Sequence, residues 1–182
     1  MKLHLITSNL GKLKEFRTAL EPLGYEVSHL PLDVEEIQAD TLEEVVADCM
    51  RQVREQGVKN FVLDDSGLFI DPFNGFPGVY SSYVLRTLGC EGILKLMHGF
   101  VVRSAYFECC IGCSLEGRGD IIVTERCGGR IVERMRGTEG FGFDPIFAAD
   151  GEVRTFAEMP LNEKNLLSHR GKAIKSLARQ LR

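Results

Sequence analysis

The chain has 182 residues and a formal net charge of −4, with 44% hydrophobic and 26% charged residues. This composition excludes a disordered tail, and the length suits a single domain over residues 1–182, either compact or pinched into two lobes around a cleft. The negative charge excludes a general binder of nucleic acid polymers, so any site for phosphate has to be local.

The first segment joins a short apolar strand to a helix whose first turn is basic. The strand and the helical hydrophobic pattern cover residues 3–6 and 13–23. Ser8 or Asn9 is a suitable N-cap, which places Lys12 and Lys14 in or near the first turn. Cations are unfavourable at this positive end of a helix, unless a phosphate binds there. The segment favours an anion site, with two solvated lysines as the alternative.

The next elements alternate between strand and helix. A strand is predicted over residues 25–30, and a helix over 41–56 starts with a capping box formed by Thr41 and Glu44. Residues 61–63 are fully apolar and predict a short, buried central strand.

Two acidic residues, Asp64 and Asp65, follow this buried strand directly. Carboxylates at such a position are costly unless they are paired or bind a metal ion. Oxygen ligands suit Mg²⁺, which also binds substrate phosphates. The alternative is an aspartate that caps an ordinary turn at residues 66–67. Glu35 and Glu36 offer further carboxylates for a metal, or are only solvated charges.

The second half of the chain is predicted to contain a run of strands between helices. The expected elements are a turn at 74–78, helices at 79–88 and 91–98, strands within 103–135 separated at residues 117, 119 and 128–129, an irregular segment at 137–145, and a helix starting near residue 168. The whole order predicts an α/β protein with a mixed sheet.

Three of the six cysteines, Cys109, Cys110 and Cys113, form a C-C-x-x-C cluster inside one of these strands. Side chains 110 and 113 of a regular strand point to opposite faces, so they cannot hold one metal ion. We predict that these thiols are buried, reduced and structural.

The irregular segment at residues 137–145 combines glycines with two aromatic residues and one carboxylate. Glycine lets a loop approach a ligand closely, and the ring of Phe141 or Phe143 could stack on a nucleobase. Pro145 holds the backbone of Asp144 extended. A hairpin whose aromatic residues fill the core explains the same pattern equally well.

A second basic helix start lies near the C-terminus. Ser168 is a suitable N-cap, so His169 and Arg170 fall in the first turn of the last helix, and Lys164 lies just before it. Surface decoration is one explanation of this group. A second anion site is the other, because the same unfavourable placement of cations occurs at Lys12.

Common catalytic and targeting motifs are absent from the sequence. It has no phosphate loop of the G-x-x-x-x-G-K-[ST] type, no G-x-G-x-x-G fingerprint and no G-x-S-x-G nucleophile elbow. We therefore expect hydrolysis by activated water rather than through a covalent intermediate. It also has no apolar run of membrane length and no signal-peptide core, so we expect a cytoplasmic protein.

Together these segments resemble the inosine triphosphate pyrophosphatase family, also called XTP/dITP diphosphatases. Five motifs match in order: Thr7-Ser8-Asn9-Leu10-Gly11-Lys12 with Glu15, Asp64-Asp65-Ser66-Gly67-Leu68, residues 75–81, residues 140–147, and Ser168-His169-Arg170-Gly171-Lys172-Ala173. No single motif is decisive, but their order over the whole chain is specific.

The resemblance implies a Mg²⁺-dependent enzyme that cleaves ITP, dITP and XTP to the monophosphate and pyrophosphate. It implies a fold with an elongated mixed sheet, flanking helices and two lobes around a central substrate cleft, in a homodimer. The implied triphosphate cradle is Thr7, Ser8, Asn9, Leu10, Gly11 and Lys12; the implied Mg²⁺ ligands are Glu36 and Asp65, with Asp65 also the proton acceptor; and the implied substrate contacts are Ser66, Phe141, Gly142, Phe143, Asp144, Lys164, His169 and Arg170.

The chain departs from the family pattern at two places. A lysine that many members carry in the second helix is missing, and Arg51 is a candidate to replace it. Phe143 stands where Tyr or Trp is common, which keeps an aromatic face and loses a polar tip.

Two other functions stay open from the sequence. One is a pyrophosphatase for modified pyrimidine or methylated nucleotides, although its Ser/Arg-rich opening motif is absent. The other is a nucleotide sensor without turnover, which the paired carboxylates disfavour because they would weaken simple phosphate binding.

Overall fold

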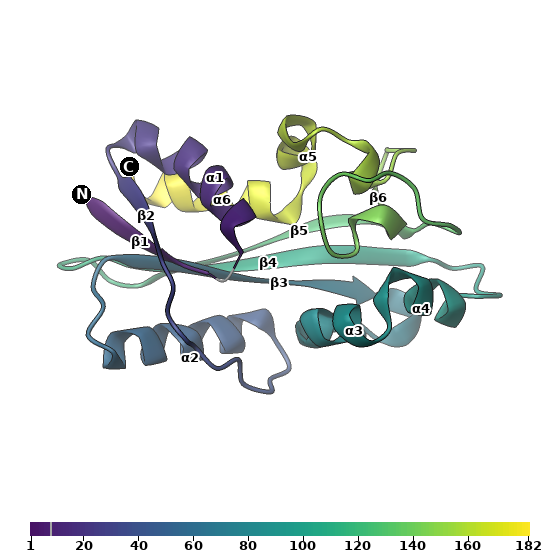
Figure 1. The fold of residues 1–182 in the computed structure, drawn as a ribbon, viewed down its shortest axis with the longest axis horizontal. Coiled ribbons are helices and arrows are strands. Elements are labelled where there is room, and N and C mark those ends of the chain that lie inside the picture. Colours follow the sequence, from purple (N-terminus) through teal and green to yellow (C-terminus); the bar gives the residue numbers. More distant parts are fainter. Residues whose placement is uncertain (8) are drawn as a thin grey trace. The chain divides into compact units, whose positions relative to one another are not determined.

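The computed structural model describes residues 1–7 and 9–182, and the strands within them form one mixed sheet in the order β2-β1-β3-β4-β5-β6 (Figure 1). β1 pairs in parallel with β2 and β3, whereas β5 and β6 are antiparallel. The strands are β1 (Lys2–Ile6), β2 (Glu26–Leu30), β3 (Phe61–Ile70), β4 (Ser104–Ser114), β5 (Ile121–Ile131) and β6 (Phe147–Ala149). The helices are α1 (Leu10–Leu20), α2 (Leu42–Glu55), α3 (Ser81–Thr87), α4 (Gly89–Leu96), α5 (Leu161–Leu167) and α6 (His169–Gln180). The predicted α/β fold with a mixed sheet is confirmed.

The chain divides into two compact units. The first contains residues 1–65, 109–125 and 173–182, and the second contains residues 66–108 and 126–172. Strands β3, β4 and β5 and helix α6 each contribute residues to both units. The single domain, the elongated outline and the central cleft stay predictions. No helix among the described residues is long and apolar enough to cross a membrane.

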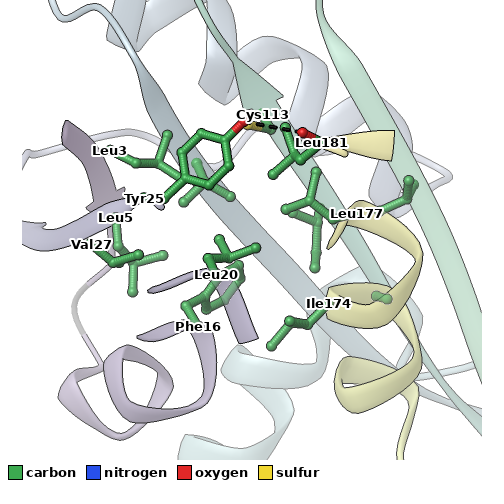
Figure 2. Packing of buried hydrophobic residues seen from close by; sticks show 14 of the residues in the cluster. Leu3, Leu5, Phe16, Leu20, Tyr25, Val27, Cys113, Ile174, Leu177 and Leu181 are labelled. Atoms are coloured by element: carbon green, nitrogen blue, oxygen red, sulfur yellow. Dashed lines mark hydrogen bonds between the residues drawn. The ribbon is translucent and has the colours of Figure 1, made fainter. Parts of the chain in front are cut away.

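The core of the first unit lies between the sheet and two helices. Phe16 and Leu20 of α1 and Leu177 of α6 are fully buried against Leu5 and its neighbours (Figure 2). Burying each such side chain contributes about 1.5–3 kcal/mol. The hydroxyl of Tyr25, which directly precedes β2, also donates to the carbonyl of Leu181, which directly follows α6, at 3.4 Å. Helix α2 covers the opposite face of the sheet (Figure 1).

The cysteines of β4 are buried, as predicted. Cys109 and Cys113 belong to the core beneath α1 and α6, whereas the intervening Gly112 faces Met50 of α2. By strand alternation, Cys110 shares the face of Gly112. Burial raises the pKa of the Cys113 thiol to about 12, so this thiol is protonated at neutral pH.

One prediction about the second unit is wrong, and one helix of this unit was missed. Gly128 and Gly129 do not separate strands but lie within β5. A Cβ atom at Gly129 would come within 2.3 Å of the Ala148 carbonyl oxygen, so glycine permits the close approach of β6. Helix α5 was not predicted, because its apolar residues, Leu161, Leu166 and Leu167, do not recur at a spacing of three or four.

Candidate active site

Strand β3 is longer than predicted, and Asp64 and Asp65 lie within it rather than after it. The pairing between β1 and β3 ends where Ile6, the last residue of β1, lies opposite Leu63. The two aspartates therefore continue β3 beyond the carboxyl end of β1. The ends of parallel strands are a common place for ligands in α/β proteins. The predicted end of β3, although wrong as a strand end, therefore still identifies the place where a ligand is expected.

Asp65 lines a pocket of about 290 Å³ together with Thr7, Lys12 and Glu36. These four residues were all predicted as site residues, and the fold brings them together from β3, the loop after β1, the start of α1 and the segment after β2. Asp33 also lines the pocket and was missed. The only indication in the sequence was that Asp33 is the first residue of the acidic stretch that contains Glu36.

Lys12 is held in this pocket by Asp64. Its Nζ lies 3.1 Å from a carboxylate oxygen of Asp64 and donates to the Asp64 carbonyl at 3.3 Å. The side chain of Asp64 is fully buried, and that of Lys12 is 15% exposed. A buried carboxylate needs such a partner. Asp64 therefore contacts Lys12, which fixes the direction of the ammonium group.

The start of α1 is shaped by hydrogen bonds along its own loop. Asn9, one of the two predicted candidates, is the N-cap, and its side-chain oxygen accepts from the Gly11 amide at 2.9 Å. The Thr7 hydroxyl accepts from the Asn9 amide at 3.0 Å. Leu10 and Lys14 are exposed, so Lys14 is not part of the pocket wall. Ser8, the other candidate cap, lies outside the described residues.

The pocket carries more negative than positive charge. Lys12 faces the four carboxylates of Asp33, Glu36, Asp64 and Asp65 among the described lining residues. A polyphosphate would be repelled by this set unless a divalent cation accompanied it. No three His, Cys, Asp or Glu side chains in the described part of the chain can hold a metal ion. Mg²⁺ needs only one or two carboxylates besides water and phosphate, so Glu36 and Asp65 fit it.

The pocket wall from α2 is formed in part by Cys49 and not by a cation. Burial first, and then the charges of Glu36 and Asp65, raise the pKa of the Cys49 thiol to about 12. Arg51 does not replace the missing lysine, because its guanidinium contacts Asp48 and Glu55 at 2.7 Å each and it is not among the described lining residues.

We expect Cys49 to resist alkylation in the folded protein. At pH 8, far below a pKa of about 12, almost none of the thiol is the reactive thiolate. Mass spectrometry after treatment with iodoacetamide should find Cys49 unmodified in buffer and modified in 8 M urea, which serves as the control. Rapid labelling in buffer would contradict the burial of this side chain.

The second unit contains a buried pair between Lys164 and Asp144. Their side-chain atoms are 2.5 Å apart, and the two side chains are 5% and 4% exposed. Asp144 also accepts from the Phe141 amide at 2.8 Å, and Lys164 lies 4.8 Å from the centre of the Phe141 ring. The pair thereby connects α5 to the glycine-rich loop. A Cβ atom at Gly140 would come within 2.1 Å of the Asp144 carboxylate, so the loop needs glycine there.

The start of α6 adds two more buried basic residues to this unit. Ser168 caps the helix by accepting from the Gly171 amide at 3.1 Å, as predicted. Arg170 donates to the hydroxyl of Ser66 at 3.3 Å and lies 5.2 Å from the ring centre of Phe141. His169 stacks on Phe107 with 4.7 Å between the ring centres.

The two aromatic residues of the loop differ in environment. Phe141 is 44% exposed and has Lys164 and Arg170 near its ring. Phe143 is 4% exposed and belongs to the core of the second unit, so it offers no open stacking face and matches the alternative in which an aromatic residue of this segment fills the core. Between them, Gly142 adopts a φ of +65° and its carbonyl accepts from the Cys90 thiol.

Comparison with known proteins identifies related chains over nearly the whole length. The Ham1 family matches residues 3–180. A dITP/XTP pyrophosphatase of Pyrococcus horikoshii is 49% identical over 97% of this chain and 94% of its own. A dITP/XTP pyrophosphatase of Thermococcus kodakarensis is 48% identical over 100% of this chain and 98% of its own.

Solved structures agree with these sequence matches. The Ham1 protein of Staphylococcus aureus superimposes with a TM-score of 0.88 at 28% identity, covering 100% of this chain and 98% of its own. A HAM1 protein from Coxiella burnetii gives a TM-score of 0.86 at 30% identity, with the same coverage.

Proposed function

The chain belongs to the Ham1 family, and from this membership we propose that it is a nucleoside triphosphate pyrophosphatase. It hydrolyses deaminated purine nucleotides, namely dITP, XTP and ITP, to the nucleoside monophosphate and pyrophosphate. The named activity of the relatives supports this proposal. The observation that carries it is the pocket in which Lys12, Glu36 and Asp65 meet at the end of β1.

In this proposal the first unit binds the triphosphate. Lys12 donates hydrogen bonds to phosphate oxygens, and the positive end of α1, which Asn9 caps, stabilises their charge. Asp65 accepts a proton from the water that attacks the α-phosphorus. The bond to the bridging oxygen then breaks, and pyrophosphate leaves. Lys12 offsets the charge that develops on the leaving group.

Glu36 and Asp65 are the residues that would hold Mg²⁺. The ion would supply further positive charge beside the phosphate oxygens, because Lys12 is outnumbered by the four carboxylates of the described pocket wall. We expect removal of the metal to abolish hydrolysis, since the single charge of Lys12 cannot balance the negative charge of a triphosphate in this pocket.

We propose that the second unit binds the base. Phe141 offers the exposed ring for stacking, and Lys164 and Arg170 are buried donors near that ring. A donor aimed at the 6-oxo group of the purine would face the amino group of adenine, leaving buried polar groups unpaired. Guanine shares the 6-oxo group, so its rejection requires a difference at position 2. Contributions of Ser66, Gly142, Asp144 and His169 to base binding stay predictions.

The test is release of pyrophosphate from ITP, XTP, dITP, ATP, GTP and UTP, with Mg²⁺ and with EDTA. We expect kcat/KM for the first three to exceed that for ATP by at least about 100-fold, because unpaired buried groups penalise adenine. EDTA should abolish release. Higher kcat/KM with pyrimidine nucleotides would favour the alternative pyrophosphatase. Binding of ITP without release would favour a sensor.

The resemblance also leads us to propose a homodimer in the cytoplasm. Light scattering of the purified protein would give the mass of the particle, with 20.3 kDa expected for the monomer. A monomeric mass at micromolar concentration would overturn the first part of this proposal.

A further inference from the structure

His29 is a part of the first unit to which neither motif nor pocket assigns a role. It lies near the end of β2, opposite Leu5 of the parallel strand β1. Its Nε2 atom is 2.7 Å from the carbonyl oxygen of Thr7, the first residue after β1. Because a carbonyl can only accept, the imidazole donates this hydrogen bond.

This bond holds the first residue of a short, continuous network. Thr7 accepts from the Asn9 amide through its hydroxyl, and Asn9 accepts from the Gly11 amide through its side chain. The amide of Lys12 donates to the Asn9 carbonyl at 3.2 Å. Each described step of the loop is therefore connected to the next, from the strand end to the lysine in the pocket. His29 is the connection between this network and a neighbouring strand.

We propose that His29 is a positioning residue for phosphate binding. It does not line the pocket in the described structure, so it acts through Thr7 and the loop that presents Lys12. The inference rests on the proposed function, since it concerns the residues that would contact the triphosphate. A loop that is displaced by even about 1 Å binds and orients phosphate less well.

The test compares His29→Leu, which removes the donor at similar size, with His29→Gln, which keeps a donor. We expect His29→Leu to raise the KM for dITP about tenfold, because the loop loses one hydrogen bond and its anchor. The value of kcat should change less than threefold, and His29→Gln should recover most of the KM effect. If the imidazole contributed only packing, His29→Gln would show the same raised KM as His29→Leu.

A matched control is Ser28→Ala on the same strand. Its hydroxyl bonds to the Nδ1 atom of His4 at 3.1 Å and does not reach the loop. This variant should keep the KM of the parent protein. The free energy of unfolding of each variant, measured by urea titration, shows whether a change in KM is accompanied by a general loss of stability or arises from the lost hydrogen bond alone.

Calorimetry with Mg²⁺ and inorganic pyrophosphate gives a second readout without turnover. The affinity of His29→Leu for pyrophosphate should fall in parallel with the rise in KM. Unchanged KM and unchanged pyrophosphate affinity in His29→Leu, with an active parent protein, would overturn this inference alone. A parent protein that neither hydrolyses the nucleotides nor binds pyrophosphate would overturn the proposed function as well.

Discussion

Replacement of Asp65 by asparagine is expected to lower kcat by at least about 100-fold. Asparagine keeps the size of the side chain but cannot accept a proton from water and is a weaker ligand for Mg²⁺. Because Asp65 lines the pocket beside Lys12, the loss should appear in kcat at saturating dITP and Mg²⁺. Steady-state release of pyrophosphate measures it.

The control for this variant is Glu35→Gln. Glu35 belongs to the same acidic stretch as Glu36, but it is exposed and its amide, not its carboxylate, bonds to Gln52. The substitution Glu35→Gln removes one negative charge near the pocket, and Glu35 is not among the described residues that line it. We expect activity within about threefold of the parent, as is usual for a surface charge. Near-parental turnover of Asp65→Asn would remove Asp65 from the proposed catalytic role.

The second large effect is expected on stability, at the buried pair of the second unit. Asp144→Ala leaves the ammonium group of Lys164 without its carboxylate partner in a site where the side chain is 5% exposed. Breaking a buried ion pair on one side costs about 3–5 kcal/mol, because the remaining charge is desolvated. The free energy of unfolding from urea titration should fall by this amount.

Two further variants separate the buried charge from other causes. The double variant Asp144→Leu with Lys164→Met removes both charges, and it should recover much of the lost stability. Glu116→Ala breaks the exposed pair with Lys59, whose side chains are 61% and 70% exposed, and should change stability by less than about 1 kcal/mol. A loss below about 1 kcal/mol in Asp144→Ala would show that Lys164 is solvated without its partner.

Features that depend on neighbouring residues were predicted correctly from the sequence. Thr41 and Glu44 form the capping box at the start of α2, and Asn9 and Ser168 cap their helices as expected. A cap involves residues two to four positions apart, so the sequence contains both partners. The acidic stretch and the basic helix starts were recognised for the same reason.

Features that depend on distant contacts were not predictable in this way. The end of β3 was misplaced because its length is determined by pairing with other strands, and not by its own apolar run. The choice between Phe141 and Phe143 was open until the core of the second unit showed which ring is buried.

The sequence by itself determined the α/β class, the local caps and the family motifs, because these follow from hydrophobic period, short-range hydrogen bonds and the order of residues along the chain. Only the tertiary structure decided that Asp64 contacts Lys12, 52 positions away, while Asp65 and Glu36 line the same pocket. It likewise decided that Cys49 stands in the pocket wall and that Arg51 is engaged elsewhere. These outcomes depend on which strand ends and helix faces meet, and that is set by packing of the whole chain rather than by any one segment. The two lysines of the first helix show the difference: both looked alike in sequence, and the fold places Lys12 beside a buried aspartate and leaves Lys14 exposed.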